Sequence, residues 1–481
     1  MDSTIEFKSL YNNCYLYDFN TNLGMLINPE FVEMIKNKSN LDSNNSYYYK
    51  KYIFLKNHGL FKQYAFDKNI SRTLTENDII NQIANTEQLT FEVTENCNLN
   101  CLYCGYGGLY AHKKRRNKYK LTFETAKSII DYCMLYWNSD KNKSIQRVIY
   151  IGFYGGEPLL NFELIKQIVD YVKKIDCYNR VQFAMTTNSL LLNKYLDFLV
   201  QNKFHLLLSL DGGSSNNIYR KKWNGENSFQ DVDKNINSLF QKYPDYFTRY
   251  VNFNAVLHNA NSVEEIFSYF KEKYNKIPQI SELNTYGIEE GKKSDFKKLF
   301  VNYEDSIIAS DKSSYLVTNL FISIPLVKDL SRFVLNYFPL KKKLYDLIKR
   351  TNITYTPTGT CIPFSKKIFV SAIGELYPCE VIHRDIPLGQ IVDGKLSLNY
   401  TYIKDVYNKK YLFIRKQCNK CYYQKSCVQC IFNMPQNNKN EIHCEHLMNK
   451  TNFKKYLAKK ISVLEKNNVF LRRIFNDIVI E

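Results

Sequence analysis

The positions of the cysteines constrain this chain more than any other feature of its sequence. Thirteen cysteines occur in 481 residues, and ten of them form two groups, a triplet within eight residues and a C-terminal set of seven. Such clustering, with an odd total, argues against a disulfide framework and favours metal or cluster ligation in a reducing compartment. The first residues include Asp2 and Glu6 and lack the basic start and apolar run of a secretory signal. We therefore expect a cytoplasmic protein that ligates metal.

The overall composition predicts a globular protein of two or three domains, because 44% of the residues are hydrophobic and 23% are charged. No apolar run approaches the roughly 20 residues that a membrane span needs. Sixty-six Lys and Arg against 47 Asp and Glu give a net charge of +19, which would attract acidic peptides, nucleic acid or anionic membranes. The bias toward Lys, Asn, Ile and Tyr is broad, so the charge does not choose among these partners.

Six apolar runs rich in β-formers alternate with helical patterns in the middle of the chain. The runs are Leu89–Val93, Val148–Tyr154, Val181–Thr186, Phe204–Leu210, Tyr250–Leu257 and Ile280–Thr285. This alternation predicts βα units around a mostly parallel sheet. Six repeats favour an open, partial (β/α)6 barrel over a closed barrel of eight units. The expected fold class is therefore α/β.

The regions that flank this barrel predict smaller domains. Tyr15–Ile27 predicts a hairpin, followed by a short helix that begins at Pro29 with Asn28 as its cap. Thr75–Thr86 is polar and is expected to be a boundary. Cys361–Cys444 lacks helical periodicity, as expected where metal ligation replaces part of a hydrophobic core. The expected domains are a winged-helix-like α+β domain at 1–85, the barrel at 86–310, a helical connector at 311–355, a cysteine-rich domain at 356–449 and a terminal helix at 450–481.

The cysteine triplet, Cys97, Cys101 and Cys104, directly follows the first predicted strand. Three thiolates this close can hold three irons of a cubane iron–sulfur cluster, and no fourth cysteine is in local reach, so one iron stays open. The alternative is a structural zinc site, although zinc prefers four closed ligands. The CxxxCxxC loop, with Tyr103 before its last cysteine, resembles the signature of the radical S-adenosylmethionine (SAM) superfamily. That resemblance implies that the open iron chelates the methionine part of SAM.

Further motifs at the ends of the next strands also resemble this superfamily. Gly155-Gly156-Glu157-Pro158 resembles its GGEP motif, in which backbone carbonyls and the Glu receive the methionine ammonium. Glycines permit close backbone approach, and a carboxylate supplies the countercharge. The carboxyl ends of barrel strands are where ligands bind. The resemblance implies that Ser209 meets the ribose or methionine of SAM and that Arg220 pairs with its carboxylate. The SAM-binding candidates are Tyr103, Gly155, Gly156, Glu157, Pro158, Thr187, Asn188, Ser209, Asp211 and Arg220.

The seven C-terminal cysteines resemble the SPASM domain of radical SAM enzymes, which carries two auxiliary 4Fe–4S clusters. The resemblance assigns Cys361, Cys379 and Cys430 to the inner cluster, and Cys418, Cys421, Cys427 and Cys444 to the outer one. With the SAM-binding cluster, the expected cofactors are SAM and three 4Fe–4S clusters. A zinc ribbon is the alternative for the CxxC pairs.

The chain departs from the SPASM pattern at two places. Two residues rather than the usual three separate Cys427 from Cys430, and residues 355–360 lack the eighth cysteine that completes the inner cluster in some members. Cys14, Cys133 and Cys177 are left over and are expected to be small buried hydrophobes. Glu380 follows Cys379 directly. Sulfatase-maturing relatives have an Asp at this place, which makes Glu380 a candidate catalytic base or, alternatively, a group beside a cluster.

Residues 1–85 resemble the leader-recognition domain of SPASM maturases, which captures a peptide as an added strand. The expected partners are a precursor peptide with an acidic leader, which the basic run 113–118 could help to bind, and an electron donor such as flavodoxin or ferredoxin, with no nucleic acid or membrane. The expected reaction is hydrogen abstraction from a peptide, followed by a thioether or carbon–carbon crosslink. The alternatives are a sulfatase-maturing enzyme that forms formylglycine and a non-catalytic metal-binding or electron-transfer protein.

Overall fold

The computed structural model divides the chain into two compact units. The first comprises Met1–Thr73, Leu326–Thr360 and Asn408–Glu481, and the second comprises Leu74–Pro325 and Cys361–Tyr407. The described residues are 4–19, 23–36, 47–61, 72–111, 118–143, 147–175, 180–334, 356–382, 384–392, 394–436, 441–466 and 468–477. Cys177, residues 113–117 of the basic run and residues 335–355 of the expected connector lie outside these ranges.

The second unit contains a ten-stranded sheet in the order β13-β12-β11-β10-β4-β5-β6-β7-β8-β9. Six neighbouring strands of this sheet pair in parallel, each with the next in the sequence. These strands are β4 (Gln88–Thr94), β5 (Ile149–Gly155), β6 (Val181–Thr187), β7 (His205–Ser209), β8 (Val251–Val256) and β9 (Gln279–Ser281). The predicted sixfold partial barrel is thus confirmed.

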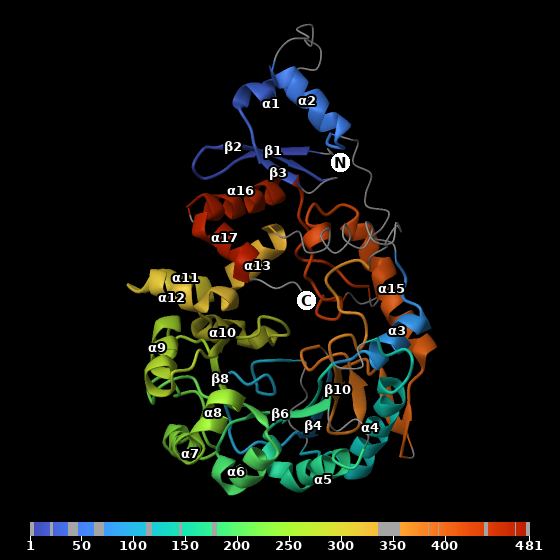
Figure 1. The fold of residues 1–481 in the computed structure, drawn as a ribbon, viewed down its shortest axis with the longest axis vertical. Coiled ribbons are helices and arrows are strands. Elements are labelled where there is room, and N and C mark those ends of the chain that lie inside the picture. Colours follow the sequence, from blue (N-terminus) through green and yellow to red (C-terminus); the bar gives the residue numbers. More distant parts are fainter. Residues whose placement is uncertain are drawn as a thin grey trace. The chain divides into compact units, whose positions relative to one another are not determined.

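Helices between these strands pack along the outer side of the sheet (Figure 1). Their inner faces follow helical spacing: α4 (Phe123–Trp137), for example, buries Ala126, Ile129, Ile130 and Cys133. Thr122 caps α4 by accepting a hydrogen bond from the backbone of Thr125. The others are α5 (Phe162–Val172), α6 (Leu192–Gln201), α7 (Phe229–Lys242), α8 (Pro244–Tyr250) and α9 (Val263–Tyr274), followed by α10 (Lys293–Leu299), α11 (Tyr303–Ile308), α12 (Ser313–Leu320) and α13 (Pro325–Val334).

Four short strands extend the barrel sheet beyond β4 and were not predicted. β10 (Ile368–Val370) pairs in parallel with β4, and β11 (Glu375–Tyr377), β12 (Gly389–Val392) and β13 (Lys395–Ser397) continue antiparallel. Strands of three or four residues are too short to show a period in the sequence. The strands on either side of Cys379, β11 and β12, therefore belong to the barrel sheet.

Two helices contradict the expectations for their segments. Thr75–Thr86 was expected to be a polar boundary, but it contains α3 (Glu76–Ala84), which starts with a capping box between Thr75 and Asp78 and buries Ile79 and Ile83. The cysteine-rich segment was expected to lack helix, but α15 (Tyr400–Cys418) runs for 19 residues. Its buried stripe consists of Ile403, Tyr407, Tyr411 and Ile414. Tyrosine at two of these four positions concealed the helical period.

The first unit contains a three-stranded antiparallel sheet, β1 (Thr4–Lys8), β2 (Cys14–Asp18) and β3 (Leu23–Leu26), followed by α1 (Pro29–Lys36) and α2 (Tyr47–Asn57). The predicted β2–β3 hairpin is confirmed, and the Asn28 side chain accepts from the backbone N–H of Glu30 at 2.9 Å. One face of the sheet packs on α1 and α2, and the other packs on α16 (Lys450–Lys466). The single terminal helix that was expected is two helices, α16 and α17 (Asn468–Asp477).

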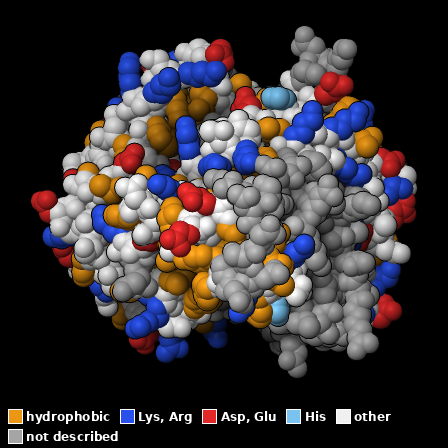
Figure 2. Space-filling view, turned by 90° about the horizontal axis from the view of Figure 1, so that it is seen from above, with side chains coloured by type: hydrophobic (Ala, Val, Ile, Leu, Met, Phe, Trp, Pro, Cys, Tyr) orange, Lys and Arg blue, Asp and Glu red, His pale blue; other side chains and the backbone are white. Residues whose placement is uncertain are grey.

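The surface charge does not single out one basic face in the view that Figure 2 gives. Lys and Arg side chains are spread over the described surface there, with acidic side chains between them. Among the described residues, no helix combines the length and apolar character that crossing a membrane requires.

Candidate active site

The loop that carries the cysteine triplet is fixed by backbone contacts with a second loop. The N–H of Asn100 donates to the carbonyl of Lys221 at 2.7 Å, and the N–H of Leu102 donates to that of Tyr219 at 3.1 Å. The indole N–H of Trp223 donates to the carbonyl of Cys97 at 2.8 Å. These bonds fix the path of the loop.

The three thiols of this loop lie within electrostatic range of one another. Burial raises the pKa of Cys101 to about 12; Arg220 opposes the shift, and the thiols of Cys104 and Cys97 add to it. Neighbouring thiols that resist ionisation alone are suited to a cation, which displaces their protons when it binds. Among the described residues, no three His, Cys, Asp or Glu side chains converge on a single ion position. The irons of a cubane occupy separate corners, so a cluster does not require such convergence.

Gly155 and Gly156 face the start of the triplet loop at very short range. A Cβ on Gly155 would lie 2.2 Å from the carbonyl oxygen of Thr94, and one on Gly156 would lie 2.0 Å from that of Asn96. The N–H of Gly156 donates to the Thr94 carbonyl at 2.8 Å, and that of Glu157 donates to the Asn96 carbonyl at 2.7 Å. The glycines are thus required by contact with the chain's own backbone. Pro158 is buried and opens a short 3-10 helix, Pro158–Asn161.

The carboxylate of Glu157 is fully buried and joins the ends of β5 and β6. It accepts hydrogen bonds from the Thr187 hydroxyl at 2.7 Å and from the backbone N–H groups of Asn188 and Leu159 at 2.8 and 3.1 Å. Burial raises the pKa of Glu157 to about 7, although these three bonds oppose the shift. The side chain of Asn188 donates to that of Asn98 at 2.7 Å, which extends the network to the triplet loop. A cation beside this carboxyl would favour its ionised form.

Asp211 and Arg220 form a buried ion pair at the ends of β7 and β8. The Nε of Arg220 lies 3.1 Å from Oδ1 of Asp211, which also accepts from the N–H of Val256 at 2.9 Å. The hydroxyl of Tyr103 donates to the other oxygen of Asp211. Burial alone would raise the pKa of Asp211, but Arg220, His258 and Tyr103 hold it below its usual range. Ser209, the last residue of β7, precedes this pair.

His258 belongs to the same cluster and was missed by the sequence analysis. Its side chain is fully buried, its Nε2 lies 3.6 Å from Oδ2 of Asp211, and its ring stacks on Tyr103 with centroids 5.7 Å apart. His258 follows β8 by two residues, so the rule that found polar residues after the other strands would have found it too.

A second missed cluster joins Glu92 and Arg384. Glu92 is fully buried in β4 and pairs with Arg384 through two hydrogen bonds of 2.7 and 2.8 Å. A glutamate inside the apolar run Leu89–Val93 indicated a buried charge that needs a partner. That partner, Arg384, could not be predicted because it lies 292 residues away in the sequence.

Glu380 is held by an ion pair with Lys367. The ammonium of Lys367 lies 3.0 and 3.1 Å from the two carboxylate oxygens, and the side chains are 21% and 27% exposed for Lys367 and Glu380. Cys379 beside it is half-buried, which raises its pKa. Cys361 and Cys379 belong to the second unit and Cys430 to the first, and their assignment to one cluster stays a prediction.

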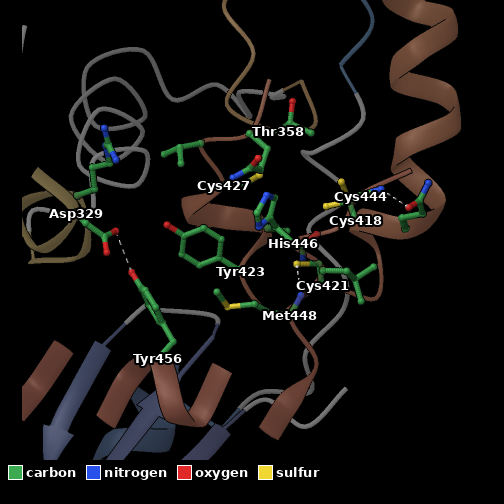
Figure 3. A pocket seen from close by; sticks show the side chains of 16 residues that line it. Asp329, Thr358, Cys418, Cys421, Tyr423, Cys427, Cys444, His446, Met448 and Tyr456 are labelled. Atoms are coloured by element: carbon green, nitrogen blue, oxygen red, sulfur yellow. Dashed lines mark hydrogen bonds between the residues drawn. The ribbon is translucent and has the colours of Figure 1, made fainter. Parts of the chain in front are cut away.

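The four cysteines assigned to the outer cluster, Cys418, Cys421, Cys427 and Cys444, line one cavity of about 360 Å³ in the first unit (Figure 3). Burial raises the pKa of Cys418 to about 12, and the other three thiols of the set add to the shift. His446 and Tyr423 line the same cavity. Four thiols around one cavity are the donor set that a 4Fe–4S cluster takes, so the residues present fit the group.

The segment that lacks the eighth cysteine packs directly against the outer-cluster loop. The N–H of Gly359 donates to the carbonyl of Gln429 at 3.1 Å, and a Cβ on Gly359 would lie 2.5 Å from the Cα of Val428. The hydroxyl of Thr360 accepts from the N–H of Ile431 at 2.9 Å. Backbone and hydroxyl contacts therefore hold residues 358–360 in place.

Comparison with known families supports the interpretation of the triplet loop. Residues 91–269, which span β4 to β8, match the model of the radical SAM superfamily. The chain contains a radical SAM domain. The structure adds the fold: anSMEcpe with bound SAM and a Cp18Cys peptide superposes with a TM-score of 0.53 at 20% identity, over 81% of this chain and 99% of that one.

Three curated proteins are similar in sequence to this radical SAM chain. An uncharacterized protein of Methanocaldococcus jannaschii is 28% identical over 68% of this chain and 96% of its own length. The radical SAM cyclopropyl synthase TigE of Paramaledivibacter caminithermalis is 27% identical over 44% of this chain and 43% of its own. A cysteine-type anaerobic sulfatase-maturating enzyme of Clostridium novyi is 26% identical over 37% of this chain and 46% of its own. The chain thus contains a radical SAM domain, and its relatives include a sulfatase-maturating enzyme.

Proposed function

We propose that this chain is a radical SAM maturase that crosslinks a ribosomally made peptide, using SAM, one SAM-binding 4Fe–4S cluster and two auxiliary clusters. The observation that carries the proposal is the hydrogen-bonded network at the strand ends. Glu157, Thr187 and Asn188 tie the ends of β5 and β6 to the loop of the cysteine triplet. When bound at a reduced cluster, SAM would supply a 5′-deoxyadenosyl radical able to remove a hydrogen atom from a substrate carbon.

The chain's own residues would bind and orient SAM from two sides. Glu157 would provide the negative charge for the methionine ammonium, and Arg220 would provide the positive charge for its carboxylate. Asp211 and Tyr103 support this role because Asp211 pairs with Arg220, and the guanidinium carbon lies 5.6 Å from the centre of the Tyr103 ring. Buried, pre-oriented charges hold a ligand with little loss of entropy at the moment of reaction.

A crosslink requires the loss of two hydrogens from the peptide. For a thioether, one C–H and one S–H bond break and one C–S bond forms. One hydrogen leaves on 5′-deoxyadenosine, and the other leaves as a proton and an electron to a one-electron acceptor such as an iron–sulfur cluster. Glu380 is the candidate base for the proton. Lys367 contacts both of its carboxylate oxygens, so the substrate would have to displace that ammonium first.

Capture of an acidic leader is supported by a cavity in the first unit. β1 is an edge strand of the three-stranded sheet, and a cavity of about 480 Å³ lies between β1 and α16. Lys8, Lys454 and Lys455 line this cavity, against one acidic residue, Glu6. An extended peptide can add to an edge strand through backbone hydrogen bonds, while lysines beside the edge attract its carboxylates.

The leader proposal is tested by the double substitution Lys454→Glu and Lys455→Glu. We expect binding of a fluorescent precursor peptide to weaken at least tenfold, since two charges on the cavity wall reverse. Lys459→Glu is the matched control, because this lysine is exposed on the same helix and does not line the cavity. Equal binding by both variants would exclude this surface.

The overall activity is tested by anaerobic reconstitution of the full chain. We expect about twelve irons per chain, the sum of three 4Fe–4S clusters, and dithionite-dependent release of 5′-deoxyadenosine. Cys101→Ala should abolish that release, whereas Cys133→Ala, which changes a buried cysteine of α4, should not. Stoichiometric zinc without cleavage of SAM would contradict the proposal and indicate a non-catalytic metal-binding protein.

The substrate is tested by co-expression with a short precursor encoded in a neighbouring reading frame. Mass spectrometry should show a loss of about 2 Da per crosslink, the mass of two hydrogen atoms. Sulfatase maturation is the second candidate, favoured by the similarity to the Clostridium novyi enzyme. It would instead oxidise one Cys or Ser of a sulfatase peptide to formylglycine, which joins no two residues. An unchanged mass in both peptides would refute both functions.

A further inference from the structure

The carboxylate of Glu92 is the centre of a buried polar cluster in the second unit. It accepts two hydrogen bonds from the guanidinium of Arg384, at 2.7 and 2.8 Å. It also accepts from the hydroxyl of Tyr106 at 2.5 Å and from the N–H of Ala372 at 3.1 Å. Arg384 in turn donates to the Tyr106 hydroxyl at 2.9 Å. The SAM-binding network described above uses none of these groups.

These groups come from two parts of the sequence that each contain a proposed cluster ligand. Tyr106 lies two residues after Cys104, and Arg384 lies five residues after Cys379. Ala372 lies in the turn between β10 and β11. One carboxylate in β4 therefore ties the loop of the cysteine triplet to the segment that follows Cys379.

The hydrogen bonds of the Glu92 carboxylate show how near these two segments lie. Tyr106 and Arg384 both donate to this carboxylate. Tyr106 is two residues from Cys104, and Arg384 is four residues from Glu380. The pair of Arg384 and Glu92 therefore fixes the segment that carries the candidate base beside the triplet loop.

Stability alone does not explain the pair of Arg384 and Glu92. A buried ion pair contributes little more to stability than well-packed apolar residues of similar volume, but it fixes direction. The rings of Phe369 and Tyr106 lie 5.3 and 5.4 Å from the guanidinium carbon of Arg384 and confine it further. Just before β4, Glu87 forms an exposed ion pair with Arg147 that lacks this enclosure.

We propose that Arg384 and Glu92 are positioning residues that hold the Cys379–Glu380 segment at the triplet loop, so that the substrate radical is converted to product as soon as it forms. This inference rests on the proposed function. Neither residue is expected to touch SAM, so the loss of the pair should leave SAM cleavage in place. What should fail is the coupling of cleavage to product, because a displacement of about 1 Å in a reacting group can slow its step about a hundredfold.

The test measures 5′-deoxyadenosine released per crosslinked peptide in the reconstituted enzyme. We expect Arg384→Gln and Glu92→Gln to raise this ratio about tenfold or more, and Arg384→Lys, which keeps the charge but not the bidentate geometry, to raise it less. Arg147→Gln, which removes the exposed partner of Glu87, is the control and should leave the ratio unchanged. The electron paramagnetic resonance signal of the reduced auxiliary clusters should shift in the first two variants only.

A variant with one charge left unpaired in the interior could fail to fold. The double substitution Arg384→Met and Glu92→Leu removes both charges at similar volume and keeps the test open. A folded double variant with wild-type coupling would overturn the inference. Failure of the proposed function gives a different result, since the wild-type enzyme would then cleave no SAM or leave the peptide mass unchanged.

Discussion

The strand-end site of the barrel and the cysteine cavity of the first unit are built in opposite ways. In the barrel, the buried carboxylates of Glu157, Asp211 and Glu92 each bind several protein donors that come from different strands and loops. In the cavity, four thiols surround about 360 Å³, and the described residues between 419 and 449 contain one 3-10 helix, Gln424–Ser426, and no strand. The barrel site is thus organised by the protein, whereas we expect the cavity to depend on the cluster that is proposed to fill it.

The largest expected effect of this difference follows removal of iron. Without clusters, we expect amide hydrogen exchange to accelerate by about a thousandfold or more around Cys418–Cys444, because ligand binding there supplies folding free energy. The strands β4 to β8 should keep their protection, because their contacts do not involve metal. Hydrogen exchange measured by mass spectrometry before and after iron chelation tests both expectations. Equal acceleration in the two regions would show that both depend on the clusters to the same extent.

A substitution of Gly156 tests how tightly the barrel site is packed. Gly156→Ala places a Cβ 2.0 Å from the carbonyl of Asn96, a backbone atom that cannot move alone. We expect a loss of about 3 kcal/mol in the free energy of unfolding, at the upper end for overpacking, together with loss of the SAM-binding cluster. Gly108→Ala is the control, since nothing lies within 4 Å of its added Cβ. Denaturant unfolding in which both variants behave alike would show that the contact can relax.

The same contrast explains how much of the molecule could be predicted from the sequence. β4 to β8 were predicted within one residue at every bound because each is an apolar run between polar segments. β10 to β13 are too short to carry a period, and the tyrosines Tyr407 and Tyr411 concealed the stripe of α15.

Within the site, residues near in the sequence were easier to predict than distant pairs. The triplet and the Gly155–Pro158 motif are local patterns, so the sequence displays them directly. The pair of Glu92 and Arg384 exists only because β10 adds to β4, and a sequence analysis that misses this strand cannot place Arg384. The atoms that SAM contacts and the ligands of all three clusters stay predictions.

The raised pKa of Glu157 predicts a pH dependence that belongs to the barrel site alone. Its folded pKa of about 7 lies above the ordinary value of 4.5, so the protonated form is favoured by folding. The contribution of Glu157 to the free energy of unfolding is fully present below pH 4.5 and is lost as pH rises through 7. The loss is about 3 kcal/mol, at 1.36 kcal/mol per unit of pKa difference.

The measurement is the difference in unfolding free energy between wild type and Glu157→Gln in the cluster-free protein. This difference should change by about 3 kcal/mol between pH 4.5 and pH 8. Asp231→Asn, which alters an exposed carboxylate paired with Lys222, serves as the control. A difference that stays constant with pH would mean that Glu157 is ionised in the folded barrel without SAM.

The smallest expected effect lies beside the cysteine cavity, at Thr360. Its hydroxyl accepts from the buried N–H of Ile431, and Thr360→Val leaves that N–H without this acceptor. In the cluster-free protein we expect Thr360→Val to lower the free energy of unfolding by less than about 1 kcal/mol. A segment that is not held by a cluster can expose this N–H to water. In the holoenzyme, where the proposed inner cluster would hold the adjacent Cys430 in place, the same substitution should destabilise the fold by about 1 to 3 kcal/mol. Thermal unfolding of both forms measures the two values. Equal losses of stability in the two forms would show that the loop around Ile431 is ordered without clusters, as we expect the barrel site to be.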